Sequence, residues 1–199
     1  MTAAEASTAG PARPRTSRLT ARPRTAPPSP DGPPDLACRP TQSPEELAAH
    51  FSVRHDVFVL EQAVFARSDR DEHDEDGRAI HLVGYCDGVV AGGVRLYELD
   101  PSTGLWQGDR LAVLPSFRIR GLGAPLVRCA VAVAGAHGGR DMVAHIQVAN
   151  VTFFTRLGWE PVGEPETYVG LPHQQMRIPL PAPDVGRSLA QAFAAGGPA

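Results

Sequence analysis

A run of arginine and glycine residues in the second half of the chain has the residue types of an anion-binding site. Arg118 and Arg120 stand just before Gly121 and Gly123, and a segment rich in alanine and valine follows. Glycine lets the backbone adopt positive φ and approach a ligand closely. The free N–H groups of a first helical turn then point at a phosphate, and the two guanidinium groups add positive charge beside it. The run therefore predicts a pyrophosphate site at the start of a helix.

A second run, residues 147–159, follows an apolar segment that is typical of a strand. It places Gln147 and Asn150 before a short predicted helix, and Phe154, Gly158 and Trp159 towards the end of that helix. Asn150 is suited to cap the helix, because asparagine is among the preferred N-cap residues. A glycine-rich turn alone is as often a plain helix start as a ligand site. The interpretation as a ligand site therefore depends on the presence of both runs at this spacing.

Together the two runs resemble the Gcn5-related N-acetyltransferases, the GNAT superfamily. The first has the pattern Arg-x-x-Gly-x-Gly at residues 118–123, after a Leu-Ala-Val-x-Pro typical of the family, and the second ends in Phe-x-x-x-Gly-Trp. The resemblance covers about residues 36–180 and implies acetyl-CoA as the acyl-donor substrate. The implied cofactor contacts are Leu111, Ala112 and Val113 for the pantetheine arm and thioester, Arg118, Ile119, Arg120, Gly121, Leu122, Gly123 and Ala124 for the pyrophosphate, and Gln147, Asn150 and Phe154 from the second run.

A stretch nearer the N-terminus adds a narrower resemblance. Residues 57–62, an acidic loop and residues 79–82 resemble a subset of these transferases, some of which are encoded beside nitrilase-type genes. The superfamily resemblance implies an N-acetyltransferase that moves an acetyl group directly to a small-molecule amine in a ternary complex. Two alternatives stay open. One is a transferase for a longer acyl group or for another acceptor, such as a homoserine-lactone-like amine. The other is a catalytically silent acyl-CoA-binding or regulatory module.

Phe154 is the main departure from the family pattern. Many members have a tyrosine at this position that protonates the leaving thiolate of CoA, and a phenyl ring has no proton to give. The thiolate leaves unassisted or through water, since a thiol is already acidic at a pKa of about 8.5, or another residue such as Tyr168 donates the proton. Binding of acyl-CoA without catalysis is the third possibility.

Transfer to an amine also requires a base, and the candidates are Glu61, Glu72, His81 and Asp109. Histidine has a suitable intrinsic pKa near 6.5, although His81 at the start of a strand equally suits a structural hydrogen bond. Asp109 has the strand parity of Leu111, so it faces the cleft if no bulge intervenes. The alternative for Asp109 is a solvent-exposed acid at a strand end.

The acceptor site is expected around the acidic loop, residues 69–76. The carboxylates of this loop either steer a cationic amine or serve only to solvate the loop. The residues assigned to the acceptor are Glu61, Asp71, Arg95 and His173, with Arg95 as the partner of a substrate carboxylate. We expect no metal centre, because the loop lacks the EF-hand pattern and two nearby histidines are a weak basis for a divalent site.

Composition narrows the class of protein. The net charge of −3 argues against nucleic-acid binding, which shows as a strong basic field. All basic residues are arginine in a chain rich in Ala, Gly and Pro, which indicates a GC-rich bacterial genome. The three scattered cysteines fit reduced thiols in a cytoplasmic protein. We expect neither a membrane span, which needs ~20 apolar residues, nor a signal peptide.

The elements that must position these residues follow from local patterns. Ser43 before Pro44, with Glu46 completing a capping box, starts a helix that runs towards residue 60. Asp87 and Gly88 join two strands as a hairpin. The predicted strands are residues 36–39, 80–85, 89–97, 106–114, 142–147, 160–168 and 174–180, and the further helices are residues 121–137 and 150–157.

This order of elements places the chain in the α/β or α+β class. The resemblance implies a single GNAT-like domain at residues 35–180, with a mixed, mostly antiparallel sheet that splays between strands 4 and 5 around the cofactor, and helices on both faces. Residues 1–34, rich in Pro, Arg and Ala, are predicted to be disordered, and residues 181–199 to be a low-complexity tail with one short helix at its centre. Pairing of a closing strand between two copies would give a homodimer, a question that the sequence leaves open.

Overall fold

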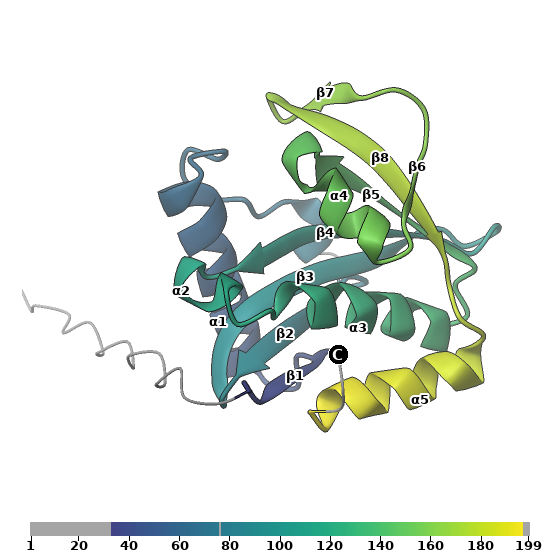
Figure 1. The fold of residues 1–199 in the computed structure, drawn as a ribbon, viewed down its shortest axis with the longest axis horizontal. Helices are drawn as coiled ribbons and strands as arrows, with labels where there is room; N and C mark the ends of the chain where they lie inside the picture. Colours follow the sequence, from purple (N-terminus) through teal and green to yellow (C-terminus); the bar gives the residue numbers. More distant parts are fainter. Residues whose placement is uncertain (1–32, 76, 197–199) are drawn as a thin grey trace, which may run out of the picture.

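One mixed sheet organises the protein (Figure 1), which is described here by a computed structural model over residues 33–75 and 77–196. The strand order is β1-β2-β3-β4-β5-β8-β6, with β7 paired to β8. The described pairs are antiparallel except for β4 with β5. The strands are β1 (Leu36–Pro40), β2 (Ile80–Cys86), β3 (Val89–Asp100), β4 (Leu105–Val113), β5 (Asp141–Gln147), β6 (Glu160–Pro161), β7 (Glu166–Tyr168) and β8 (Leu171–Pro179).

Helices cover both faces of this sheet, which confirms the predicted fold class. Adjacent glycines of β3 show it, because neighbouring strand residues point to opposite faces. A Cβ on Gly92 would lie 2.7 Å from Leu126 of α3, and one on Gly93 would lie 2.6 Å from Nδ1 of His50 in α1. The helices are α1 (Pro44–Arg54), η1 (His55–Glu61), η2 (Glu72–Asp74), α2 (Pro115–Arg118), α3 (Gly123–Ala136), η3 (Val148–Asn150), α4 (Val151–Arg156) and α5 (Pro183–Ala194).

β4 and β5 pair only near their starts, and this sets the place of the site. Residues 105–107 pair with residues 141–143, and no pair between the two strands is described beyond them. β4 keeps its pairing with β3 as far as Val113, and β5 keeps its pairing with β8 as far as Gln147. The predicted splay between the fourth and fifth strands is therefore confirmed, and it leaves one edge of each strand open.

A β-bulge in β4 sets side-chain directions beside the splay. Arg110 and Leu111 together oppose the single residue Val94 of β3. Arg110 has a φ of 52°, a left-handed conformation of the kind that bulges accommodate. Because two residues oppose one, the alternation of faces shifts, and Asp109 does not share the face of Leu111. The prediction that Asp109 faces the cleft by strand parity assumed that β4 has no bulge here, and β4 has one.

Local signals for the first helix and the hairpin act as predicted, with one difference. The Ser43 hydroxyl accepts a hydrogen bond from the Glu46 N–H at 3.3 Å, as an N-cap does. The Glu46 carboxylate, however, accepts from the Gln42 N–H at 2.7 Å and not from the N–H of Ser43, so the predicted capping box is not formed. Asp87 and Gly88 have φ of 52° and 78°, the left-handed pair of a tight hairpin turn.

The first helix continues directly into η1, a π-helix that the sequence pattern did not distinguish from an α-helix. α2 is a further short helix that was not predicted. The closing strand expected at residues 160–168 is instead two short strands, β6 and β7, each paired with β8. These differences lie around the splay, where long-range packing decides the local conformation.

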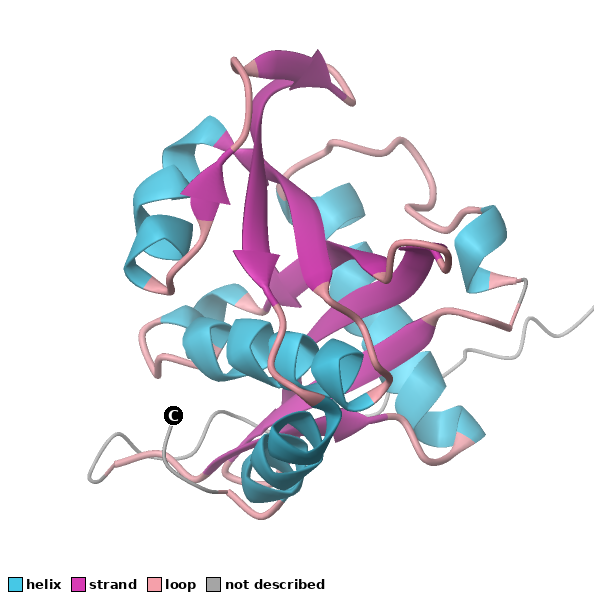
Figure 2. Ribbon diagram, turned by 90° about the vertical axis from the view of Figure 1, so that its right-hand side faces the viewer, coloured by secondary structure: helices cyan, strands magenta, loops and turns pink. Residues whose placement is uncertain are grey.

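The chain after residue 180 packs on the domain. Figures 1 and 2 show α5 alongside α3 on one side of the sheet, with α1 on the other. Gly186 of α5 comes so close that a Cβ would lie 2.5 Å from the Ala136 nitrogen, and Phe193 is buried. The packed part of the chain therefore extends further than the sequence predicts. The disordered segment predicted for residues 1–34 lies outside the described residues except for its last two.

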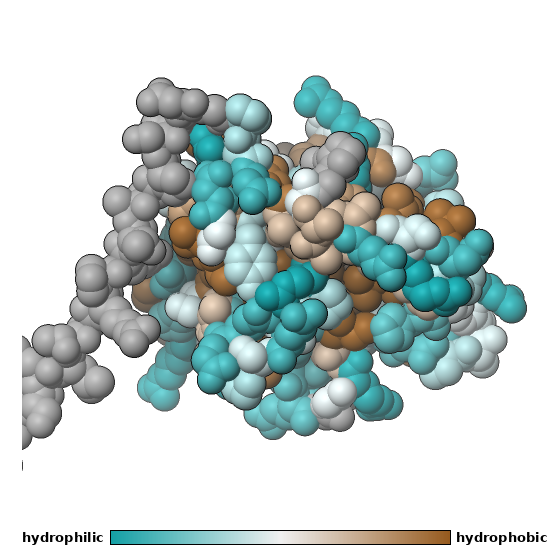
Figure 3. Space-filling view, turned by 90° about the horizontal axis from the view of Figure 1, so that it is seen from below, coloured by the Kyte–Doolittle hydropathy of each residue, from teal (hydrophilic) through white to brown (hydrophobic). Residues whose placement is uncertain are grey.

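On the face seen from below, hydrophobic and hydrophilic residues lie side by side (Figure 3). The exposed hydrophobic side chains among the described residues include Val185 and Leu189 of α5. Within residues 33–75 and 77–196, no helix is both long enough and apolar enough to span a membrane.

Candidate active site

The splay opens into a groove and a cavity that share a wall. The groove has a volume of about 420 Å³ and is bounded by the start of α3, the end of β4 and α4. The cavity has a volume of about 160 Å³ and lies between β4, β5, the residues after η1 and the β7–β8 hairpin. Both are lined by Gln62, Leu111, Gln147, Asn150 and Phe154. A ligand that fills the groove would therefore reach the cavity at this junction.

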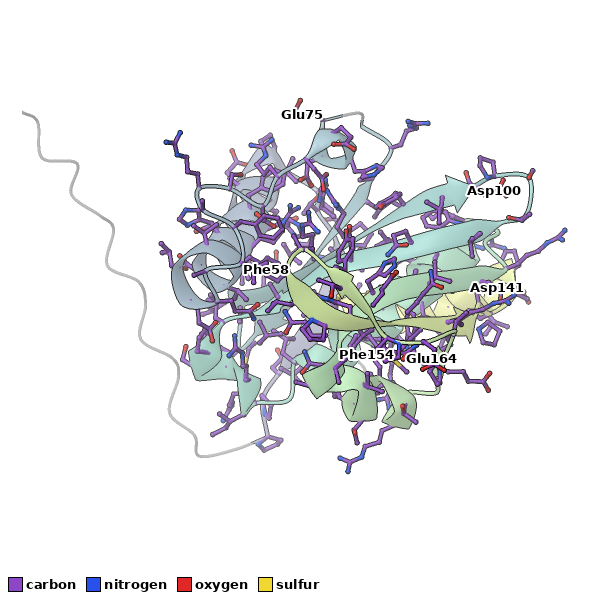
Figure 4. The ribbon with its side chains drawn as sticks, turned by 90° about the horizontal axis from the view of Figure 1, so that it is seen from above. Phe58, Glu75, Asp100, Asp141, Phe154 and Glu164 are labelled. Carbon is purple, nitrogen blue, oxygen red and sulfur yellow. The ribbon has the colours of Figure 1, made fainter. Side chains whose placement is uncertain are left out.

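The β7–β8 hairpin covers the cavity. In Figure 4, seen from above, this hairpin crosses the sheet between Phe58 of η1 and Phe154 of α4, and both of these rings line the cavity. Tyr168 and Val169, at the tip of the hairpin, line it as well. The wall is mixed: aromatic and aliphatic side chains lie beside amide, histidine and charged groups, among them Asp109 and Arg110.

The start of α3 has the features of an anion site. Gly121 has a φ of 83°, which only glycine adopts readily, and Arg118, Gly123 and Ala124 line the groove beside it. The first residues of a helix have no intrahelical partner for their N–H groups. A phosphate in the groove would meet those of Gly123 and Ala124 together with the Arg118 guanidinium.

Four residues of the predicted cofactor set do not have side chains in the groove. Ile119 is 88% exposed, and Leu122 and Ala112 are buried in the core. Arg120 turns away and pairs with Asp87 of the β2–β3 turn at 3.0 Å. The remaining members of the set, including Gln147, Asn150 and Phe154 from the second run, line the groove.

Glu61 lies at the mouth of the groove and not at the acceptor cavity. Its carboxylate accepts two hydrogen bonds from Arg118, at 2.7 and 2.6 Å. Arg118 also donates from Nε to the Val113 carbonyl at 3.1 Å, so its guanidinium is held at the groove. A bound phosphate would compete with Glu61 for this arginine, because both are anions that bind guanidinium in bidentate fashion.

The acidic loop turns inward onto arginines. Arg54 and Arg95 are completely buried. Arg54 donates to Asp69 at 2.6 Å and to Asp74 at 2.7 Å, and Arg95 donates to Asp109 at 2.8 and 2.6 Å. We call this group the charge cluster, and its members are Arg54, Arg95, Arg110, Asp69, Asp71, Asp74 and Asp109. The loop is therefore not a simply solvated segment.

Two residues assigned to the acceptor are members of this cluster and bind each other. Asp71 accepts from Arg95 and, at 3.0 Å, from Arg110. The structure thus places Asp71 and Arg95 in an internal ion pair, where neither offers a free charge to a substrate. Burial alone would raise the pKa of the neighbouring Asp74, but hydrogen bonds from Arg54 hold that pKa well below its ordinary value, so this carboxylate is ionised.

The cluster carries one net negative charge. It contains four carboxylates and three guanidinium groups. The adjacent histidines do not offset the difference, because burial lowers the pKa of His50 to about 3 and that of His81 to about 4. Asp109 and Arg110 are the members of the cluster that line the cavity. The cavity wall therefore presents one carboxylate with one guanidinium beside it.

Two predicted bases lie away from the cavity. His81 is buried against His50, with Nδ1 3.3 Å from His50 Nε2, and Glu72 is exposed on η2. Neither lines the groove or the cavity. Asp109 does line the cavity, although both of its oxygens accept hydrogen bonds from Arg95. Of the four candidates, Asp109 alone is near the junction.

A second polar group lies across the cavity on β5, β7 and β8. His173 and Tyr168, both singled out in the sequence, line the cavity together with His145. His145 Nε2 is 3.0 Å from the Glu166 carboxylate, and its ring is stacked on Tyr168 with centroids 4.8 Å apart. His145 and Glu166 were not among the site residues predicted from the sequence. One signal in the sequence could have identified His145: it lies two residues before Gln147 in a mostly apolar strand, so the two side chains share a face.

Comparison with known proteins identifies the family. The model of the acetyltransferase (GNAT) family matches residues 45–159. An uncharacterized N-acetyltransferase of Bacillus subtilis, YjcF, is 31% identical over 133 residues, which are 66% of this chain and 91% of that protein. The chain belongs to the GNAT acetyltransferase family. Membership supports an acyl-CoA-dependent N-acyltransferase.

Solved structures agree on the fold of this GNAT protein. An N-acetyltransferase-like protein from Lactobacillus plantarum has a TM-score of 0.65 at 23% identity, over 73% of this chain and 98% of that chain. The CoA-dependent acyl-homoserine lactone synthase BjaI, solved with SAM and isopentyl-CoA, has a TM-score of 0.63 at 19% identity, over 82% and 91% of the two chains. At these identities the likeness concerns the fold alone.

Among residues 33–75 and 77–196, no three His, Cys, Asp or Glu side chains are grouped so that they could hold a metal ion. His73, considered in the sequence with His81, instead stacks on Tyr97 with centroids 4.0 Å apart. The histidines near the acidic loop are thus engaged in packing.

Proposed function

We propose that this protein is an acetyl-CoA-dependent N-acetyltransferase that transfers the acetyl group directly to a small-molecule primary amine in a ternary complex. The observation that carries the proposal is the meeting of the groove and the cavity at the open edge of β4. Leu111 lines both the groove, which includes Gly121 at its phosphate end, and the cavity. A CoA thioester laid along the groove then presents its carbonyl to the cavity.

Direct transfer fits the residues at this junction. The described groove and cavity residues include no cysteine or serine, and an amine that is held against the thioester needs no covalent enzyme intermediate. The amine nitrogen attacks the carbonyl carbon, and backbone N–H groups on the open edge of β4 near Val113 stabilise the oxyanion. As the C–S bond breaks, Tyr168 or water protonates the thiolate in place of the tyrosine that Phe154 replaces.

The lining of the cavity supports an amine with an apolar or aromatic body. Asp109 is the one acidic side chain among the described lining residues and suits a single ammonium group, and the rings of Phe58, Phe65 and Tyr168 suit an apolar substituent. A polyamine would place further positive charges against walls that offer no further free carboxylate among the described lining residues. The volume of about 160 Å³ suits a small acceptor or a short acyl group.

The setting of the protein belongs to the same proposal. We place it in a bacterial cytoplasm, acting without a metal, a membrane or nucleic acid, and the homodimer stays a prediction. The resemblance to transferases encoded beside nitrilase-type genes stays a prediction as well. An acyl-CoA-binding module without catalysis is the second candidate, and the absence of a proton donor at Phe154 favours it.

The first experiment is calorimetric titration with acetyl-CoA and with longer acyl-CoAs. Micromolar binding, about −8 kcal/mol, is the expected result, with acetyl-CoA at least as tight as the longer donors. Amines are then screened for CoA release, from phenylethylamine to spermidine. Binding without release for any amine would favour the silent module, and no binding to any acyl-CoA would overturn the proposal. Gly121→Glu is the matched variant, and it should abolish binding because a carboxylate would stand where the phosphate lies.

A further inference from the structure

A row of polar side chains crosses three strands at the wall of the cavity. His173 of β8 pairs in register with Gln147 of β5 on one side and with Glu166 of β7 on the other. Directly paired residues of neighbouring strands share a face of the sheet, with Cβ atoms about 5 Å apart. Gln147 lines both the groove and the cavity. His173 is therefore the next side chain along from the junction at which a thioester would lie.

We propose that His173 is the general base of the transfer, and that His145 and Glu166 form a positioning pair that holds β7 over it. The inference deepens the proposed N-acyltransfer and rests on it. His173 was singled out in the sequence only as a residue lining the acceptor pocket. Its role as a base follows from three features: the tautomer of its ring, its position at the cavity wall, and the strand β7 that covers it.

The hydrogen bond of His173 fixes its tautomer. Nδ1 lies 2.9 Å from the Leu171 carbonyl, and because a carbonyl oxygen only accepts, the proton of the neutral ring is on Nδ1. Nε2 then carries the lone pair. His173 is 6% exposed and lines the cavity, so the basic nitrogen is available to a group inside the cavity and shielded from bulk water. A base within hydrogen-bond reach of the attacking nitrogen is what amine acylation requires.

His145 holds the hairpin that covers this base. Glu166 and Tyr168 are the β7 side chains on the cavity face, and both contact His145, by an ion pair at 3.0 Å and by stacking at 4.8 Å. The Tyr168 ring in turn lies edge-on to His173, with centroids 5.4 Å apart. β7 has three residues and no buried side chain, so these contacts are its main attachment besides its ladder to β8.

The titratable groups around His173 are consistent with this division of roles. Glu166 and Tyr168 face it from β7 and His145 faces it from β5, and Asp109 and Arg110 of β4 line the same cavity. Asp109 is bound to Arg95 through both oxygens, so it is poorly suited to take a proton from the acceptor. His173 has no such partner on Nε2 among the described residues.

The chemistry balances without a further reactant. The acceptor ammonium gives one proton to His173 Nε2, and its freed electron pair forms the C–N bond at the thioester carbonyl. When the tetrahedral intermediate collapses, the C–S bond breaks and the thiolate takes the second proton of the nitrogen, through Tyr168 or water. His173 returns its proton to solvent. The products are the amide, free CoA and one proton.

The test compares two acceptors in the full-length protein. Phenylethylamine is protonated at pH 7.5 and needs a base, whereas hydroxylamine is already neutral and does not. His173→Asn keeps a donor for the Leu171 carbonyl, and it should lower kcat with acetyl-CoA and phenylethylamine by about 100-fold or more, with a much smaller loss for hydroxylamine. Imidazole should restore turnover in His173→Ala. The exposed His55, outside the cavity, gives the control His55→Asn, which should leave both rates unchanged.

Binding separates the two proposals. Acetyl-CoA affinity, measured by calorimetry, should be the same in wild type and in both His173 variants, because the base does not touch the groove. His145→Ala should raise the KM for the amine more than it lowers kcat, and imidazole should not rescue it. If the His173 variants lose kcat equally for both acceptors, or for neither, His173 is not the base. The proposed acyltransferase activity would not be affected by that result. If the wild type binds acetyl-CoA but transfers to no amine, both proposals fall.

Discussion

The buried pair His50 and His81 should make this protein unstable in mild acid. His50 is fully buried, its Nδ1 donates to the Leu82 carbonyl at 2.9 Å, and its Nε2 lies 3.3 Å from His81 Nδ1. Arg54 approaches the same Nε2 at 3.5 Å. Protonation of either ring would place a new charge beside a guanidinium in the core. Burial therefore lowers the pKa of His50 to about 3 and that of His81 to about 4.

The sign and size of the effect follow from proton linkage. Below about pH 6.5 the unfolded chain binds a proton at each of these two histidines, and the folded protein does not. Stability rises with pH wherever the unfolded state binds more protons, so the free energy of unfolding falls as the pH drops. Each histidine contributes up to ~1.4 kcal/mol per pH unit. Because the unfolded histidines are half protonated at pH 6.5, acidification from pH 6.5 to 5.0 should cost ~3 kcal/mol for the pair. That is a large part of the ~5–15 kcal/mol of a typical domain.

Urea unfolding between pH 5.0 and 7.0, followed by the fluorescence of Trp106 and Trp159, measures this slope. Both indoles are in the core. The paired aspartates do not interfere, because their lowered pKa values move their loss of stability below this range. His81→Asn should halve the slope, and the exposed His55→Asn should keep it. A wild-type slope below ~1 kcal/mol per pH unit, or an unchanged slope in His81→Asn, would refute the reasoning.

Three further predictions concern the groove, the charge cluster and the hairpin. Arg118→Ala should weaken acetyl-CoA binding by about 10- to 100-fold, since a charge-assisted hydrogen bond contributes ~1.5–3 kcal/mol. Glu61→Gln should strengthen acetyl-CoA binding by up to about fivefold, because an exposed ion pair contributes at most ~1 kcal/mol. Calorimetry measures both affinities. Arg95→Met should cost ~3–5 kcal/mol of stability in urea unfolding, because it leaves buried carboxylates unpaired. Val169→Asn should raise stability by ~1 kcal/mol, since the β-branched Val169 has a φ of 49°, which asparagine tolerates better.

Matched variants keep these tests specific. Arg177 pairs with Asp141 at the surface, with 56% of its side chain exposed, so Arg177→Met should cost less than ~1 kcal/mol. Val162 is also exposed and has no positive φ, so Val162→Asn should not stabilise the protein. Weaker acetyl-CoA binding in Glu61→Gln would contradict the competition at Arg118. Equal stability of Arg95→Met and wild type would contradict the role of the charge cluster.

Much of the fold could be predicted because its signals are local. Ser43 and Pro44 start the first helix, and Asp87 with Gly88 turns the hairpin, each through the conformation of a few neighbouring residues. The phosphate end of the groove is equally local, since Gly121 and the first turn of α3 lie within a few residues of one another. The predicted GNAT family is confirmed for the same reason, because both motifs are continuous in sequence.

The catalytic and acceptor residues could not be predicted to the same extent. Strand parity predicted that Asp109 faces the cleft, and Asp109 does line the cavity, but the bulge at Arg110 and the pairing of both Asp109 oxygens with Arg95 were not predicted. Asp71 and Arg95 have the types of substrate-binding residues, but they lie against each other. Whether a charged side chain faces a cavity or a counter-ion depends on which segments pack beside it, and those segments are distant in the chain.

The sequence by itself determined the Ser43 cap, the Asp87-Gly88 turn, the glycine turn before α3 and most of the order of elements, because each is set by sterics and hydrogen bonds between near neighbours. The tertiary structure alone decided the inward turn of the acidic loop and the packing of α5 on α3. It also decided the meeting of His145, Glu166 and His173 on three strands. Strand register and burial fix these arrangements, and both arise from contacts between residues far apart in the chain.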